Sequence, residues 1–268
     1  MRNKISAVVI LFCLTLGLFS CSKRQEKVEN PPLDPLGSDG VATILLDAGH
    51  GFGDVGCTSE YLDGLYEYEL TMDFTMRLAK KLEDMGYKVL LTHDGESYIS
   101  EEEICLRADE KDIEYMPDKM SVGNNVFDAY ERAVYANVLD AEVEIDFMLS
   151  VHVNANADTN TAQGFEIDYC ADNESSEMSA FVFDSICDAL ERDFSGRRLK
   201  KFADSWEMAF IVTKYTSMPS ILFETGFAST PSDAELLLDE NWRDKLMTTI
   251  SEGIDDYFAS GGLVPPAA

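Results

Sequence analysis

Two of the chain's three histidines stand where an imidazole could bind a metal ion. His50 follows the apolar stretch 43–48 after one glycine, and His152 directly follows the mostly apolar stretch 145–151. Both stretches are typical of buried strands, and open α/β sheets bind ligands at the carboxyl ends of their strands. Catalytic zinc sites often combine two histidines with one carboxylate and leave a fourth position for water. The two histidines together indicate a metal site, although either one alone would more often be structural.

Carboxylates that could complete such a site occur at two places. Glu67 and Glu69 stand just before a helical pattern, where they could lie beside His50. Because they are two residues apart, they point to different sides of a helix, and at most one of them faces the site. Glu224 ends the apolar run 219–223 and precedes Thr225 and a glycine. A carboxylate at the end of a buried strand is a candidate general base.

The glycines after His50 allow a second interpretation. Residues 51–56 have the spacing G-x-G-x-x-G of a dinucleotide-binding loop, which requires a helix to begin within the glycines and hold the pyrophosphate. Residues 57–64 are instead turn-like and lack helical periodicity. We therefore expect these glycines to leave room for a metal and a substrate beside His50.

The elements that must position these residues alternate between strand and helix. We expect strands at 43–46, 87–92, 145–151, 164–169, near 210–212 and at 219–223, and helices at 70–85, 101–110, 128–141, 174–194 and 241–258. This alternation predicts an α/β domain whose mainly parallel, twisted sheet of about five to six strands carries helices on both faces. The rest of the acidic stretch 95–126 is expected to be irregular, as a lid or a surface elaboration.

The N-terminus is predicted to direct export. Arg2 and Lys4 precede an apolar core that ends near residue 20, as in a signal peptide. The run 18–21 (L-F-S-C) resembles a bacterial lipobox, which implies cleavage before Cys21 and lipid attachment to its thiol. A signal peptide with an incidental cysteine, or an uncleaved anchor, is the alternative. We expect a signal peptide at 1–20, a flexible tether at 21–42, one catalytic domain at 43–258 and a disordered tail at 259–268.

The charge of the chain excludes some partners, whereas its cysteines leave two possibilities open. Without residues 1–20 the chain keeps 19 of its 21 basic residues against 50 acidic ones, a formal charge of −31. Such a chain is not expected to bind nucleic acid, which requires clustered lysine and arginine, and it offers no polybasic patch to a membrane. Four cysteines remain in the domain, at 57, 105, 170 and 187; disulfides and buried free thiols both stay open.

Six segments together resemble the zinc-dependent N-acetylmuramoyl-L-alanine amidases of the third amidase family, which cleave bacterial cell wall. In chain order they are 47–51 (D-A-G-H-G), 67–72 (E-Y-E-L-T-M), 91–93 (L-T-H), 132–137 (R-A-V-Y-A-N), 150–155 (S-V-H-V-N-A) and 219–227 (P-S-I-L-F-E-T-G-F). The chain departs from the family pattern at Ala48, where the family has proline, and at His93, where it has an arginine that is not a ligand. We expect His93 to be structural or on the surface.

The resemblance implies a mechanism and a place of action. His50, Glu67 and His152 would hold one Zn²⁺ per chain, which selects Glu67 over Glu69, and Glu224 would be the general acid/base on a zinc-bound water. The substrate would be the amide bond between N-acetylmuramic acid and L-alanine in peptidoglycan, reached by an exported, lipid-anchored enzyme of the cell envelope. An inactive cell-wall-binding lipoprotein and a zinc peptidase or amidohydrolase of the same fold are the alternatives. A protein regulator is left unknown by the sequence.

Overall fold

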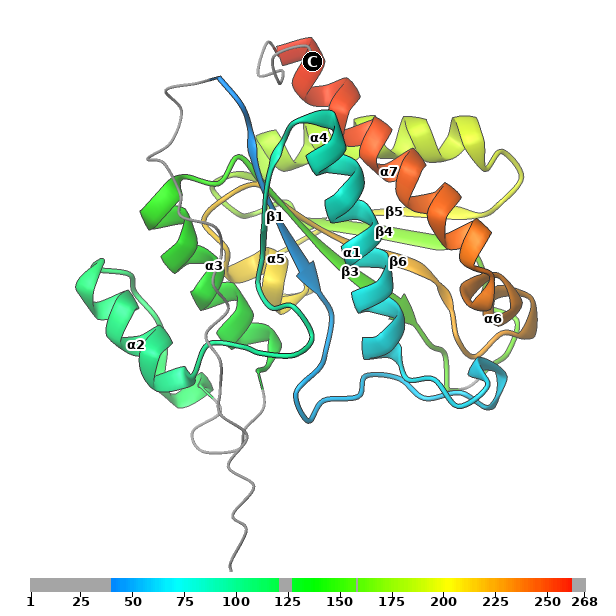
Figure 1. The fold of residues 1–268 in the computed structure, drawn as a ribbon, viewed down its shortest axis with the longest axis horizontal. Helices are drawn as coiled ribbons and strands as arrows, with labels where there is room; N and C mark the ends of the chain where they lie inside the picture. Colours follow the sequence, from blue (N-terminus) through cyan, green and yellow to red (C-terminus); the bar gives the residue numbers. More distant parts are fainter. Residues whose placement is uncertain (1–39, 121–126, 158, 262–268) are drawn as a thin grey trace, which may run out of the picture.

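The computed structural model describes residues 40–120, 127–157 and 159–261. Figure 1 shows one sheet with helices packed against it. The elements, in chain order, are β1 (Thr43–Ala48), η1 (Glu60–Leu62), α1 (Glu67–Met85), β2 (Lys88–Leu91), α2 (Glu101–Glu110), η2 (Pro117–Lys119), α3 (Ala129–Val143), β3 (Phe147–Asn154), β4 (Phe165–Cys170), α4 (Ser176–Asp193), β5 (Leu199–Asp204), α5 (Ile211–Tyr215), β6 (Ser220–Phe227), α6 (Pro231–Leu238) and α7 (Glu240–Gly261).

The six strands lie in the order β2-β1-β3-β6-β4-β5. Neighbouring strands are parallel except for β4, which runs antiparallel to β6 and parallel to β5. The prediction of a mainly parallel sheet of five to six strands is confirmed. One edge of the sheet therefore gathers the carboxyl ends of β1, β3 and β6 together with the amino ends of β4 and β5.

Helices cover both faces of the sheet, as predicted. α1, α4 and α7 pack on one face, where apolar residues of β1, β3, β4 and β6 form a core with them. α3, α2 and α5 lie on the other face, over a second apolar cluster that includes Leu45, Met148 and Leu222. Figure 1 shows α1 crossing the central strands, with α2 and α3 beyond them at the left of the view. Burial on both faces explains why β1 and β6 are buried at every position.

The structure corrects the assignment of strand and helix after residue 196. The strand expected near 210–212 is wrong: residues 211–215 form the short helix α5, and the edge strand is β5, at 199–204. β5 is largely exposed and includes Lys200 and Lys201, so it lacks the apolar run that marks a buried strand. The sequence analysis also missed α6, and α7 continues to Gly261, past the expected boundary at 258.

Several expectations concern residues outside the described part of the chain. The signal peptide at 1–20, the lipidation of Cys21, most of the tether at 21–42 and most of the tail at 259–268 fall there, as do residues 121–126 of the acidic stretch. The described part of that stretch forms α2 and η2, and α2 packs against α3. Within the described residues, every helix is too short or too polar to cross a membrane.

Candidate active site

Three predicted ligands converge at the edge where β1 and β3 end. The Nε2 atom of His50 and the Nδ1 atom of His152 lie 3.1 Å and 3.2 Å from the same oxygen, Oε1 of Glu67. One ligand atom from each of the three residues lies within 4.8 Å of the others. Two imidazoles and one carboxylate are a donor set that suits zinc. The three side chains therefore form a possible metal site.

The loop after β1 is shaped to admit these side chains. His50 has a φ of 68°, a left-handed backbone conformation that is uncommon outside glycine. A Cβ atom on Gly49 would lie 2.3 Å from the His152 ring, and one on Gly56 would lie 2.6 Å from Oε2 of Glu67. Both glycines thus provide space for ligand side chains. No helix begins in residues 51–56, since the first helical residues after β1 are in η1, so the dinucleotide interpretation is wrong.

Glu67 is held as a carboxylate that faces the two histidines. It is the first residue of α1, and its two oxygens accept backbone N–H groups from Cys57 (2.7 Å) and Val153 (3.0 Å). Burial would raise its pKa, but hydrogen bonds and charge interactions with His152 and His50 outweigh burial and lower that pKa. Glu69 instead turns back to accept the N–H of Tyr66 as a helix cap. Of the two candidates, only Glu67 faces the site.

The two imidazoles have different surroundings. Burial lowers the pKa of His152, despite its contact with Glu67, and so favours the neutral ring. For His50 burial also acts to lower the pKa, but Glu67 and Asp54 together raise it. Asp54 Oδ2 lies 2.7 Å from His50 Nδ1, a contact that orients the ring and leaves Nε2 directed at Glu67. Two carboxylates that favour an imidazolium would equally favour a bound cation.

Glu224 lies beside this group, on the next strand. It is paired in register with His152, and the β3–β6 register shifts between His152 and Asn154. Glu224 is only 8% exposed, and its Oε2 atom is buried with no hydrogen-bond partner among the described residues. Burial, followed by the charges of Glu67 and Glu166, raises the pKa of Glu224 well above its ordinary value. Such a group is a candidate proton acceptor.

Three further polar residues near Glu224 were not predicted as site residues: Asn154, Glu166 and Lys200. Glu166 is paired in register with Glu224 across β4 and β6, so both side chains lie on the same face of the sheet. Its carboxylate accepts Nδ2 of Asn154 at 2.8 Å and forms an ion pair with Lys200, the residue beside it on β5. Glu166 could have been noticed because it lies within a predicted strand. Its partner Lys200 was missed because the edge strand was expected near 210–212 and lies at 199–204.

A second acidic centre lies under the same loop, deeper in the sheet. Asp47 is fully buried and lies 2.8 Å from Nε of Arg132 on α3. It also accepts the hydroxyls of Thr92 and Ser150, both at 2.7 Å. Burial would raise the pKa of Asp47, but Arg132 and the two hydroxyls lower it. The carboxylate form of Asp47 is therefore favoured, and Arg132, Thr92 and Ser150 are its partners.

The remaining candidates have structural surroundings. His93 is buried, and its Nε2 atom lies 2.9 Å from the carbonyl oxygen of Ala48; this placement agrees with the structural option and not with a surface position. Burial lowers the pKa of His93. The four domain cysteines are free thiols, those at 170 and 187 being buried.

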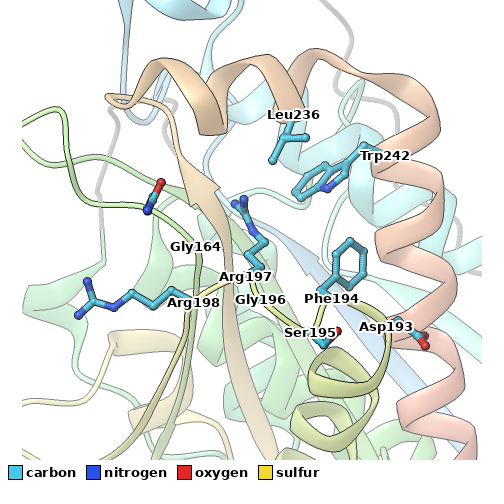
Figure 2. A pocket seen from close by; sticks show the side chains of 10 residues that line it. Gly164, Asp193, Phe194, Ser195, Gly196, Arg197, Arg198, Leu236 and Trp242 are labelled. Carbon is cyan, nitrogen blue, oxygen red and sulfur yellow. The ribbon is translucent and has the colours of Figure 1, made fainter.

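A cavity of about 480 Å³ lies at the start of β5 and contains none of the site residues described above. Figure 2 shows that Arg197 and Trp242 face it, while the Arg198 side chain extends away from Trp242. The Arg197 guanidinium pairs with Asp233 and lies over the rings of Phe165 and Trp242. Arg197 is thus a packed, paired group at the sheet edge.

Two imidazoles and a carboxylate brought together at the strand ends of an α/β sheet, with a further buried carboxylate on the next strand, are typical of metal-dependent hydrolases. A family model described as N-acetylmuramoyl-L-alanine amidase (Amidase_3) matches residues 44–256. The chain belongs to this family of amide hydrolases.

Individual relatives agree with the family assignment. The germination-specific N-acetylmuramoyl-L-alanine amidase of Bacillus subtilis is 28% identical over 269 residues, covering 99% of this chain and 100% of the relative. The amidase LytC of the same organism is 28% identical over 233 residues, which cover 87% of this chain and 38% of LytC. A crystal structure of an N-acetylmuramoyl-L-alanine amidase from Clostridium difficile 630 has a TM-score of 0.59 and 26% identity, covering 82% of this chain and 98% of that one.

Proposed function

We propose that the protein is a zinc-dependent enzyme that hydrolyses the amide bond between the lactyl group of N-acetylmuramic acid and L-alanine in peptidoglycan. Family membership supports the substrate class. The observation that carries the mechanism is the position of Glu224, which is in register with His152 and next to the converging side chains of His50 and Glu67. Its buried Oε2 atom has no hydrogen-bond partner in the part of the chain that the structure describes.

His50, Glu67 and His152 would hold one zinc ion per chain. The lowered pKa of Glu67 favours its carboxylate and the lowered pKa of His152 favours its neutral ring, which are the forms that bind a metal. Asp54 would hold the ring of His50 so that Nε2 faces the ion. The chemistry that zinc would supply there is polarisation of the scissile carbonyl and a lower pKa of the attacking water.

Glu224 would move the proton in both halves of the reaction. A buried carboxylate with a raised pKa is a stronger base than an exposed glutamate. It would take a proton from the attacking water and deliver that proton to the nitrogen of L-alanine as the amide bond breaks. In this proposal the leaving amine lies within reach of Glu224, on the side of the site that is away from β1.

Removal and return of the metal test this proposal. Protein stripped with a chelator should cleave a muramyl peptide at less than about 1% of the original rate, because the carbonyl then lacks its Lewis acid. Addition of one equivalent of zinc should restore cleavage, which is measured by mass spectrometry of the freed L-alanyl peptide. Full activity in protein shown to be metal-free would contradict zinc dependence. A zinc-loaded protein that binds peptidoglycan without cleaving it would favour the binding-lipoprotein alternative.

We also propose that the chain is exported and anchored by a lipid on Cys21. The lipobox-like run 18–21 and the apolar segment before it support this location. When extracts of cells that make the protein are separated into detergent and aqueous phases, the wild-type protein should enter the detergent phase. Cys21→Ala should enter the aqueous phase. Equal partitioning of both proteins would contradict the anchor.

A further inference from the structure

The described edge strand β5 and the residues before it form an unusually basic segment in an acidic protein. Arg192, Arg197, Arg198, Lys200 and Lys201 lie within ten residues that contain one acid, whereas the chain has 50 acidic and 21 basic residues. Successive side chains of a strand point to opposite faces, so this segment presents cations on both sides of the sheet.

Two of these cations lie on the face that carries Glu224. Lys200 pairs with Glu166, which is in register with Glu224, so all three share one face. Arg198 lies two residues before Lys200, and its carbonyl accepts the N–H of Phe165 at the start of the ladder. Period-two alternation therefore places Arg198 on the same face. Figure 2 agrees, because Arg198 extends away from Trp242, which lies on the opposite face.

Both cations have hydrogen-bonding capacity to spare. The Arg198 side chain is exposed and, among the residues that the structure describes, has no carboxylate within ion-pair distance. The Lys200 side chain is 32% exposed, and its ammonium group lies over the ring of Phe227. One of its three N–H donors suffices for Glu166. The other three cations are paired: Arg192 with Asp193, Arg197 with Asp233, and Lys201 with Glu191.

We propose that Arg198 and Lys200 form a binding subsite for a carboxylate on the peptide side of the scissile bond, namely the free α-carboxylate of the second stem residue, a glutamate linked through its side chain. This inference rests on the proposed function. The proposed metal ligands come from the loop after β1, the end of β3 and the start of α1. Glu224 must reach the leaving nitrogen to protonate it, so the proposal directs the peptide to the other side of Glu224, toward β4 and β5.

The distances between strands agree with this placement. Neighbouring strands lie about 4.8 Å apart, so the Lys200 ammonium, which sits at Glu166 on β4, is about one strand spacing from Glu224. The carboxylate of the second residue is one residue away from the leaving nitrogen, and a chain spans at most about 3.6 Å per residue. The long side chain of Arg198, the residue just before β5, then supplies a second, bidentate donor.

A pair of substrates isolates this contact. Two muramyl tripeptides, both amidated at the C-terminus, would differ only in a carboxylate or a carboxamide at the α-position of the second residue. The zinc-loaded wild-type protein should have a kcat/KM about tenfold higher for the carboxylate, as expected for one charge-assisted contact. Arg198→Ala should reduce this ratio about threefold, and Arg198→Ala with Lys200→Gln should bring it near one.

The control is Lys201→Ala, because Lys201 lies on the opposite face and pairs with Glu191; its ratio should equal that of the wild type. Equal rates on both substrates in the wild type would overturn the subsite alone, and so would an Arg198→Ala protein that loses activity on both substrates by the same factor. If a third substrate, with a carboxylate only at its C-terminus, were preferred, the assignment to the second residue would be overturned. Failure to cleave any of the three would overturn the proposed function and the subsite together.

Discussion

Asp47 and Glu224 are carboxylates on neighbouring parts of one sheet, and their surroundings are opposite. Asp47 is surrounded by Arg132, Thr92 and Ser150, which lower its pKa although it is fully buried. The Oε2 atom of Glu224 is buried and has no partner among the residues placed by the structure, and burial together with nearby acidic groups raises the pKa of Glu224.

The difference separates two uses of a buried charge. A fully partnered carboxylate gains nothing from a further contact, so it holds the structure together. An unpartnered carboxylate destabilises the fold, and it is retained where a proton or a substrate will provide the missing partner. We therefore expect substitutions at Glu224 to affect catalysis and substitutions at Asp47 to affect stability.

The largest expected effect is on the rate of the Glu224→Gln protein. Removal of the proton acceptor should lower kcat by about 10³-fold, within the usual range for a general acid/base. The zinc content should stay near one per chain, because His50, Glu67 and His152 are unchanged. The thermal midpoint should be equal to or above that of the wild type. A loss of zinc together with the loss of rate would show that Glu224 supports the metal site and not the proton transfer.

The next effect is on the stability of the Asp47→Asn protein. This change leaves Arg132 buried without its counter-ion, which should lower the free energy of unfolding by about 3–5 kcal/mol. Urea denaturation followed by circular dichroism measures this change. Asp84→Asn is the matched control, because Asp84 pairs with Lys80 on the exposed side of α1; its midpoint should not move. A loss below about 1 kcal/mol in Asp47→Asn would mean that the buried pair contributes little.

The two carboxylates should also give opposite pH dependences of stability in metal-free protein. The pKa of Asp47 is lowered in the folded state, so its contribution is present above the ordinary value of 3.8 and is lost as the pH falls through the folded value. The pKa of Glu224 is raised, so the folded state keeps its proton above the ordinary value of 4.5. Stability should therefore fall as the pH rises from there toward the folded value.

Urea midpoints measured from pH 3 to pH 8 test these signs. Relative to the wild type, Glu224→Gln should become more stable as the pH rises. Asp47→Asn should lack the fall in stability that titration of Asp47 causes at acid pH. Parallel pH curves for wild type and Glu224→Gln would contradict a raised pKa at Glu224.

The smallest expected effect concerns a single partner of Asp47. Thr92→Val removes one hydroxyl that donates to the carboxylate at 2.7 Å, while Arg132 and Ser150 remain. The free energy of unfolding should fall by about 1 kcal/mol, and the rate on a muramyl peptide should be unchanged. A lower rate of cleavage by Thr92→Val protein that is fully folded under the assay conditions would link Asp47 to the active site.

The sequence predicted the positions that follow regular, buried strands. His50, His152 and Glu224 could be placed at one edge because β1, β3 and β6 are apolar runs, and strand ends of that kind meet at a common edge. Glu67 could be chosen over Glu69 only from the family resemblance, since helix geometry says that the two diverge but not which one faces the site.

What could not be predicted depends on pairing between distant segments. β5 is an exposed edge strand without an apolar run, so the sequence did not reveal it, and Lys200 and Arg198 were missed with it. The antiparallel β4–β6 pairing, which puts Glu166 next to Glu224, is a tertiary choice that local patterns do not specify. Asp54 was missed because its role depends on the left-handed turn at His50.

Identification of the bond that is cut tests the account most directly. Peptidoglycan digested by the zinc-loaded protein and analysed by mass spectrometry should release intact stem peptides with a free L-alanine amine, and should leave glycan strands that carry free lactyl carboxylates. The Glu224→Gln protein should release none above background. Cleavage within the glycan strands, cleavage between amino acids of the stem, or undiminished release by Glu224→Gln would contradict the account.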